Sequence, residues 1–372
     1  MKKILLALTI TLIAACVWAG SFEDATAEYE KKNYVAAVKY LKLAAAQGGA
    51  IAEFNLGLMY SKGQGVAQDY SEALRWFKLA AAKNDASAQF KLGVMYENGQ
   101  GVKQNYAETV RWYKLAATRD NESAQYNLAL MYTDGQGVKQ NYAEAMRWFK
   151  RAAAHGNASA QYNIGFMYEN GQGVVKNYAE AVRWYERAAA QGNVSAQYNI
   201  GLMHRDVLQN YAEAVRWFKM AAAQGAADAQ YNIGLMYFNG EGVVQDYAEA
   251  VRWFKLAAAQ GIADAQYNIG LMYSNGRGVA QDYVEAVRWF NIAAAQGSAM
   301  AQTSLGFRYS NGQGVGQDYV RAHMWHYLAA VSGDKTAANN RDSVAAKMTP
   351  QQISEAQKLA RECQARNFKN CN

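Results

Sequence analysis

The chain of 372 residues contains few of the residue types from which many catalytic and metal sites are built. It has one proline, three cysteines and four histidines. So few cysteines and histidines exclude a disulfide-rich scaffold or an array of zinc modules. The sequence also contains no GxSxG, no HExxH and no SxxK followed by SDN and KTG, which are the signatures of common hydrolases. We therefore predict a protein that is not an enzyme and binds no cofactor or metal.

The charge of the chain is mildly basic and is spread along its length. The net charge is +7, and removing Lys2 and Lys3 with the leader described below leaves +5. Many arginines follow a glutamate by three residues, as in Glu108 with Arg111. Pairs at this spacing stabilise an exposed helix face. Because no basic block stands apart from them, we do not expect nucleic-acid binding.

A short glycine-rich sequence recurs along the whole chain. It reads KGQGV at 62, NGQGV at 98, DGQGV at 134, NGQGV at 170, NGEGV at 239, NGRGV at 275 and NGQGV at 311. A tyrosine follows in the same register, at Tyr70, Tyr106, Tyr142, Tyr178, Tyr211, Tyr247, Tyr283 and Tyr319. The period is 36 residues, except for one step of 33. A fixed period of this size indicates a stacked repeat array, and seven copies argue against a phosphate-binding loop.

Each repeat has the pattern of two helices joined by a glycine turn. Ala265, Ile269 and Met272 form one apolar stripe at helical spacing. Gly276 follows where a left-handed residue can end the first helix. Asp282, with Glu285 three residues later, is placed to cap the second helix. The sequence therefore predicts an all-α fold of helix-turn-helix units in which the glycines are structural.

The repeated pattern AxAQYNIGxMYxNGxGVxQDYxEAVRWFxxAAAQG resembles the consensus of the Sel-one-like repeat family, which is related to the tetratricopeptide repeats. The match extends over nearly the whole chain after residue 21. The resemblance implies a right-handed α/α superhelical solenoid and an adaptor or scaffold role. It also implies a secreted or periplasmic protein, as many bacterial members are.

The repeats divide the chain into four predicted segments. About eight units occupy residues 49–332, between N-terminal capping helices at 20–48 and C-terminal capping helices with a tail at 333–372. The fifth unit, at 196–228, lacks three residues and both turn glycines, so we expect its hairpin to close differently. Thr349, Pro350 and Gln352 predict a capping box at the start of the last helix.

Residues 1–19 have the features of a secretory signal peptide. Lys2 and Lys3 precede an apolar run that is too short to span a membrane, and cleavage is expected after Ala19. An alternative is a lipoprotein signal in which Cys16 is acylated and becomes the mature N-terminus. In both cases the mature chain is exported, with a periplasmic, cell-surface or secreted location, and has no transmembrane span.

Cys363 and Cys371 are the cysteines that remain after export. In an oxidising compartment an isolated pair of this kind predicts a disulfide that joins the tail to the last helix. A redox-active or metal-binding pair is the alternative, although the spacing is not CxxC and no histidine is close in sequence.

A protein or peptide is the predicted partner, because a solenoid presents a long surface to an extended segment. The candidate binding residues are the asparagines of the repeated QYN sequence: Asn127, Asn163, Asn199, Asn232 and Asn268, with Asn55 at the same position. These amides can either bond the backbone of a bound segment or satisfy groups of neighbouring helices, and the sequence does not distinguish the two.

A hydrolase is the alternative function. Some cysteine-rich members of the family are described as penicillin-binding proteins with weak β-lactamase activity, but they carry cysteine pairs inside their repeats and this chain does not. His323 and His326 are three residues apart and can form half of a metal site, although a framework role is the simpler interpretation.

Overall fold

The structure is a computed structural model that describes residues 20–369 and 371. Every regular element within these residues is a helix, as the repeat pattern predicts. None of the helices described is both long enough and apolar enough to cross a bilayer. The predicted signal peptide at 1–19 and Cys16 lie outside the described residues.

Each repeat is a pair of antiparallel helices of almost constant length. The first helices are α3 (Ala50–Lys62), α5 (Ala86–Asn98), α7 (Glu122–Asp134), α9 (Ala158–Asn170), α11 (Val194–Leu202), α13 (Ala227–Asn239), α15 (Ala263–Asn275) and α17 (Ala299–Asn311). The second helices are α4 (Tyr70–Ala82), α6 (Tyr106–Thr118), α8 (Tyr142–Ala154), α10 (Tyr178–Ala190), α12 (Tyr211–Ala223), α14 (Tyr247–Ala259), α16 (Tyr283–Ala294) and α18 (Tyr319–Val331). The tyrosine that marks the register is therefore the first residue of each second helix.

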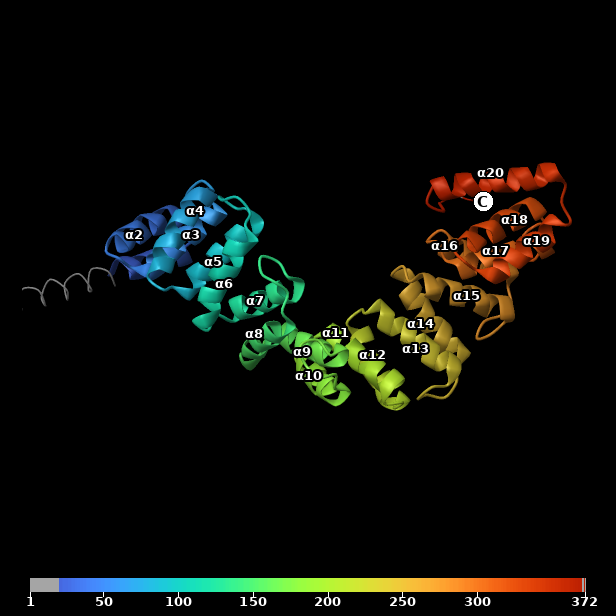
Figure 1. The fold of residues 1–372 in the computed structure, drawn as a ribbon, viewed down its shortest axis with the longest axis horizontal. Coiled ribbons are helices and arrows are strands. Elements are labelled where there is room, and N and C mark those ends of the chain that lie inside the picture. Colours follow the sequence, from blue (N-terminus) through green and yellow to red (C-terminus); the bar gives the residue numbers. More distant parts are fainter. Residues whose placement is uncertain (1–19, 370, 372) are drawn as a thin grey trace, which may run out of the picture. The chain divides into compact units, whose positions relative to one another are not determined.

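The helix pairs form two compact units, Met1–Gln191 and Gly192–Asn372. Within each unit every pair packs on the pair that follows it in sequence, so the chain is an α/α solenoid (Figure 1). The first unit begins with a helix over residues 20–30 and α2 (Tyr34–Ala46), and the second ends with α19 (Lys335–Ala345) and α20 (Pro350–Ala365).

Large aromatic side chains of the second helices fill the space beside small residues of the first helices. Phe290, for example, is fully buried, and a Cβ added to Gly270 would lie 2.5 Å from its ring. The same pairing occurs in most repeats. Each repeat thus has its own core at close packing, which is continued by the core of its neighbour.

The two turn glycines have different functions. Gly99 has a φ of +70° and ends α5 in the left-handed conformation, as predicted. Gly101 also has a positive φ, but a Cβ on it would lie 2.4 Å from the carbonyl oxygen of Tyr70 in the preceding repeat. The second glycine therefore lets the turn contact the backbone of the previous second helix.

The fifth repeat closes without turn glycines. Its first helix, α11, continues into a π-helix, η1 (Met203–Val207), and Gln209 takes a φ of +51° before α12 begins. The amide of Asn210 donates to the carbonyl oxygen of His204 at 2.8 Å. The expectation of a differently closed hairpin is confirmed, because a π-helix and a short connection replace the glycine turn between α11 and α12.

The predicted caps are present at the ends of the helices. The Asp282 carboxylate accepts from the amides of Val284 and Glu285, and Thr349 forms a full capping box with Gln352 ahead of Pro350. Cys363 and Cys371 form a disulfide with a Cα–Cα distance of 5.1 Å. The bond holds the chain end beside α20.

Candidate functional site: the first-helix face

The surface that carries the predicted binding residues is defined by two positions of each first helix, and we call it the first-helix face. One position is the asparagine of QYN, which is replaced by Lys91 in α5 and by Ser304 in α17, and the other is the apolar residue three positions later. The two side chains lie on the same side of the helix because residues three apart are neighbours. The apolar residues are Leu58, Val94, Leu130, Phe166, Leu202, Leu235, Leu271 and Phe307.

The apolar position of this face is unusually accessible. Phe166 is 39% exposed and Phe307 is 49% exposed, whereas the other members are half-buried. The helices thus present a row of apolar side chains within each unit, and the helix over residues 20–30 lies beside this row at Leu58. A row of this kind can contact apolar side chains of another molecule.

The asparagine amides donate hydrogen bonds inside the stack. The Nδ2 atoms of Asn163 and Asn268 lie 3.4 Å from the hydroxyls of Tyr126 and Tyr231, each in the preceding repeat. Asn232 bonds in the same way to Tyr198, whereas Asn127 donates to Tyr113 on the second helix of the preceding repeat. Asn199 occupies the equivalent position in α11. The amide donors therefore link neighbouring repeats, which is one of the two roles that the sequence allowed.

The side-chain oxygens of three of these asparagines, unlike their Nδ2 donors, have no hydrogen-bond partner among the described residues. Among the residues that the structure describes, no donor contacts Oδ1 of Asn127, Asn163 or Asn268. In Asn232, by contrast, Oδ1 accepts from the guanidinium of Arg205. The three oxygens can accept N–H groups from a bound segment while the donors hold their place in the stack.

A polar cavity of about 440 Å³ lies at the shortened repeat. Arg205, Asp206 and Gln209 line it from one side, and Leu235 with Asn239 from α13 on the other. The Arg205 guanidinium is paired with the Asp206 carboxylate at 2.5 Å. Its charge is therefore already balanced by a neighbour.

The second helices carry the predicted ion pairs on their exposed sides. Arg111 lies 3.2 Å from Glu108, and Arg252 lies 3.2 Å from Glu249. The arginines of these pairs are more than half exposed, so each pair contributes little to stability.

Two buried tyrosines have a partner that we did not anticipate from the sequence. The Tyr113 hydroxyl donates to the Glu97 carboxylate at 2.5 Å, and Tyr185 donates to Glu169 at 2.6 Å. Burial raises the pKa of the Tyr113 hydroxyl, and the Glu97 bond raises it further. The repeats that have phenylalanine here lack the glutamate sixteen residues earlier, and this covariation was the signal that could have revealed the pair.

The two histidines of the last repeat are part of its core. His326 takes the place of the aromatic residue, and a Cβ on Gly306 would lie 2.5 Å from its ring. Burial, together with the nearby His323, lowers the pKa of His326 to about 4. The structure shows no group of three or more potential metal ligands within residues 20–369 and 371.

Comparison with known proteins agrees with this geometry. The Sel1 repeat model matches nine segments: 22–49, 50–85, 86–121, 122–157, 158–193, 194–225, 227–262, 263–298 and 299–334. The first segment corresponds to the helices that we interpreted as the N-terminal cap. No curated protein matches the chain.

Two solved structures are similar over most of their length. A protective antigen present in uropathogenic Escherichia coli strains, which displays an SLR fold, is 30% identical with a TM-score of 0.60. The alignment covers 96% of this chain and 85% of the antigen. A Sel1 repeat protein from Oxalobacter formigenes is 33% identical with a TM-score of 0.67, over 81% of this chain and 89% of that one. Solenoids of this kind are generally protein-interaction scaffolds. The chain therefore belongs to the Sel1 repeat family.

Proposed function

We propose that the protein is a non-catalytic scaffold of the bacterial envelope that binds a protein or peptide partner along the first-helix face. The observation that carries the proposal is the combination of accessible apolar side chains with unpaired amide oxygens. Phe166 supplies apolar contact area, and Oδ1 of Asn163, one turn away, supplies an acceptor. An extended segment offers both complements, since it alternates side chains with backbone N–H groups.

A non-catalytic role agrees with the regularity of this face. A catalytic site brings unlike groups together at one place, whereas the first-helix face presents an asparagine and an apolar residue in six of its eight helices. The penicillin-binding alternative gains no support, because Cys363 and Cys371 lie beyond the last matched repeat.

The envelope location has two supports. The N-terminal sequence has the pattern of a cleaved secretory signal, and a disulfide between Cys363 and Cys371 is typical of oxidising compartments. Both cleavage after Ala19 and acylation of Cys16 are compatible with export. Mass spectrometry of the protein purified from its envelope fraction distinguishes them.

Site-specific photo-crosslinking tests the binding surface. A photoreactive phenylalanine analogue is placed at Phe166 or Phe307, and as a control at Val175 or Val244, which are highly exposed but lie in turns. We expect the same adduct from both first-helix positions in intact cells and none from the turn positions. Phe166→Ser should then weaken binding of the purified partner, while Val175→Ser should not. Equal crosslinking from all four positions would contradict the proposal.

A further inference from the structure

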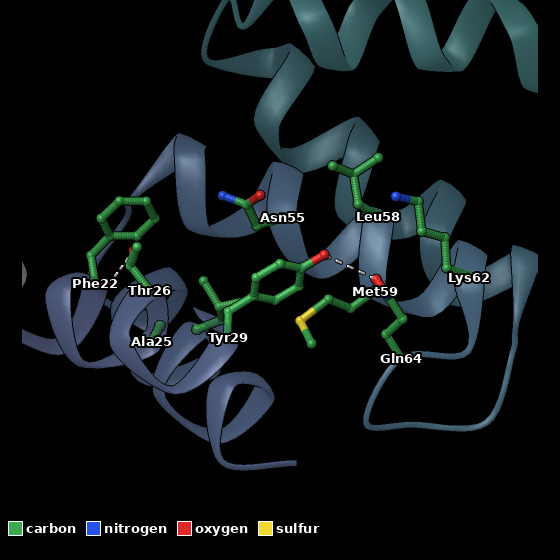
Figure 2. Close-up of a pocket in the computed structure, with 10 residues that line it drawn as sticks. Phe22, Ala25, Thr26, Tyr29, Asn55, Leu58, Met59, Lys62 and Gln64 are labelled. Carbon is green, nitrogen blue, oxygen red and sulfur yellow. Dashed lines mark hydrogen bonds between the residues drawn. The ribbon is translucent and has the colours of Figure 1, made fainter. Parts of the chain in front are cut away.

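An apolar cavity lies at the beginning of the first unit, where the helix over residues 20–30 packs beside the first of the first helices, α3. It has a volume of about 330 Å³, at the lower end of the range of about 300–1,000 Å³ that is usual for small-ligand pockets. One wall is the helix over residues 20–30, and the other is α3 (Figure 2). Leu41 of α2 also lines it.

The residues on the two walls follow the same helical spacing. Phe22, Ala25, Thr26 and Tyr29 lie at helical spacing on the first wall, and Asn55, Leu58, Met59 and Lys62 have the same spacing on α3. Tyr29 reaches across, and its hydroxyl donates to the side-chain oxygen of Gln64 at 3.4 Å (Figure 2). The cavity is thus bounded by two helices, and this bond joins the first of them to the turn that follows α3.

The cavity arises because small side chains occupy places that are filled in the regular repeats. Leu41 lies at the register position that Phe77 and Tyr113 occupy in the next two repeats, seven residues after the marker tyrosine. Its side chain is smaller than those rings. Ala25 adds only a methyl group on the opposite wall, and Met59 is almost fully buried. The interior is therefore apolar.

The mouth of the cavity carries a cation that the fold does not require. Lys62 precedes the turn glycine, and the six other repeats that keep this turn have asparagine or aspartate at its position. Within the described residues Lys62 forms no ion pair. Lys62 is the one charged residue among those that line the cavity, so its ammonium is complementary to an anionic group attached to an apolar chain.

We infer that this cavity binds a small anionic amphiphile, with its apolar chain between the helix of residues 20–30 and α3 and its carboxylate or similar anion at Lys62. The chain contacts Phe22, Leu58 and Met59, and the amide of Asn55 lies beside it. The cavity shares Asn55 and Leu58 with the first-helix face, but Lys62 and the helix over residues 20–30 belong to the cavity alone. The crosslinking test at Phe166 and Phe307 does not involve these residues, so failure of either proposal leaves the other standing.

Binding of octanoate, octanol and octylammonium to the purified chain tests the inference. Titration calorimetry measures the affinities, and the NMR signal of the Met59 methyl group reports the location, with Met131 as a distant reference. We expect a saturable shift of Met59 alone. Octanoate should bind about fivefold more tightly than octanol, because an exposed ion pair adds only a small free energy, and octylammonium should bind most weakly.

Two substitutions separate the roles of charge and cavity. Lys62→Asn introduces the residue of other repeats and should remove the preference for octanoate over octanol, while Lys103→Asn should not. Leu58→Phe, a residue that α9 and α17 carry at this position, should fill the cavity and weaken octanoate binding at least tenfold. Its matched control is Leu130→Phe on α7, which should leave binding unchanged.

The inference is overturned if Met59 shows no saturable shift or if Leu58→Phe binds octanoate as well as the native chain. Equal affinities for octanoate and octanol would also overturn it. They would identify the cavity as a binding site for an uncharged apolar group such as a peptide side chain.

Discussion

At the scale of single residues, the occurrence of tyrosine or phenylalanine at the core position of the second helix depends on the residue sixteen positions earlier. Tyrosine replaces the core phenylalanine only where a glutamate can accept a hydrogen bond from its hydroxyl, as in the pair of Tyr113 and Glu97. The apolar character of the position was predictable from its helical spacing. The hydroxyl partner was not, because it depends on how the two helices of one repeat are rotated against each other.

Loss of the Tyr113 hydroxyl should be coupled to the presence of Glu97. Tyr113→Phe leaves the partly buried carboxylate without its donor and should lower the free energy of unfolding by about 1–3 kcal/mol. The double variant Glu97→Ser with Tyr113→Phe recreates the pair of Ser61 and Phe77 and should recover much of that loss. Urea denaturation of the four proteins in a double-mutant cycle measures the coupling, and strictly additive losses would contradict it.

His326 should make the protein less stable in mild acid. Its pKa is about 4 in the folded chain against an ordinary value of 6.5, so the unfolded chain binds the proton first as the pH falls. Stability is therefore complete above about pH 6.5 and declines toward pH 4, by up to about 3 kcal/mol. Burial lowers the pKa of His323 as well, so it acts in the same direction.

The substitution His326→Phe isolates this effect, because phenylalanine is the residue found at this position in other repeats. The variant should lose less stability than the native chain between about pH 7 and about pH 4.5 in urea denaturation. The control is His155→Gln, which changes a histidine in an inter-repeat turn. Parallel pH profiles for the native chain and His326→Phe would rule out the assignment.

At the scale of elements, the helix pair and its turn follow closely from the sequence. The apolar stripe, the left-handed Gly99 and the Asp282 cap are local features, and local features can be read from spacing alone. The contact of Gly101 with the Tyr70 carbonyl could not be predicted in this way, since it depends on how one repeat is placed on the next. The same reason explains why the π-helix of the fifth repeat was expected only as an irregular closure.

The two turn glycines should differ in their tolerance of alanine. Gly99→Ala incurs mainly the cost of a left-handed residue, about 1–2 kcal/mol. Gly101→Ala incurs the same cost and also places a Cβ against the Tyr70 backbone, which should add about 1–3 kcal/mol. Chemical denaturation of the two variants gives the comparison. Equal losses would show that the contact between repeats is not tight in solution.

At the scale of the whole molecule, the repeat pattern predicts the solenoid, because each helix pair can bury its apolar face only against a neighbour. The asparagines of the first-helix face were identified correctly as a recurring feature, and their binding role stays a prediction. The N-terminal cavity was not foreseen. It depends on the placement of the helix over residues 20–30 against α3, which no local pattern encodes.

A core substitution in one repeat should destabilise mainly that repeat and its neighbours. Phe254→Ala removes a fully buried ring and should cost about 3–5 kcal/mol in its own repeat. Hydrogen exchange followed by mass spectrometry should show faster exchange in α13 and α14, less in α16, and no change in α3 and α4. A uniform increase along the chain would instead indicate one cooperative unit.

The contact between Gly101 and the Tyr70 backbone also bears on how such a chain can change in length during evolution. Each turn is fitted to the helix one period earlier, so a duplication of a whole period supplies a new turn together with the helix that it contacts. A deletion within a period removes one partner of that fit. The fifth repeat is three residues shorter and lacks both turn glycines, and a π-helix closes its hairpin in place of the fitted turn.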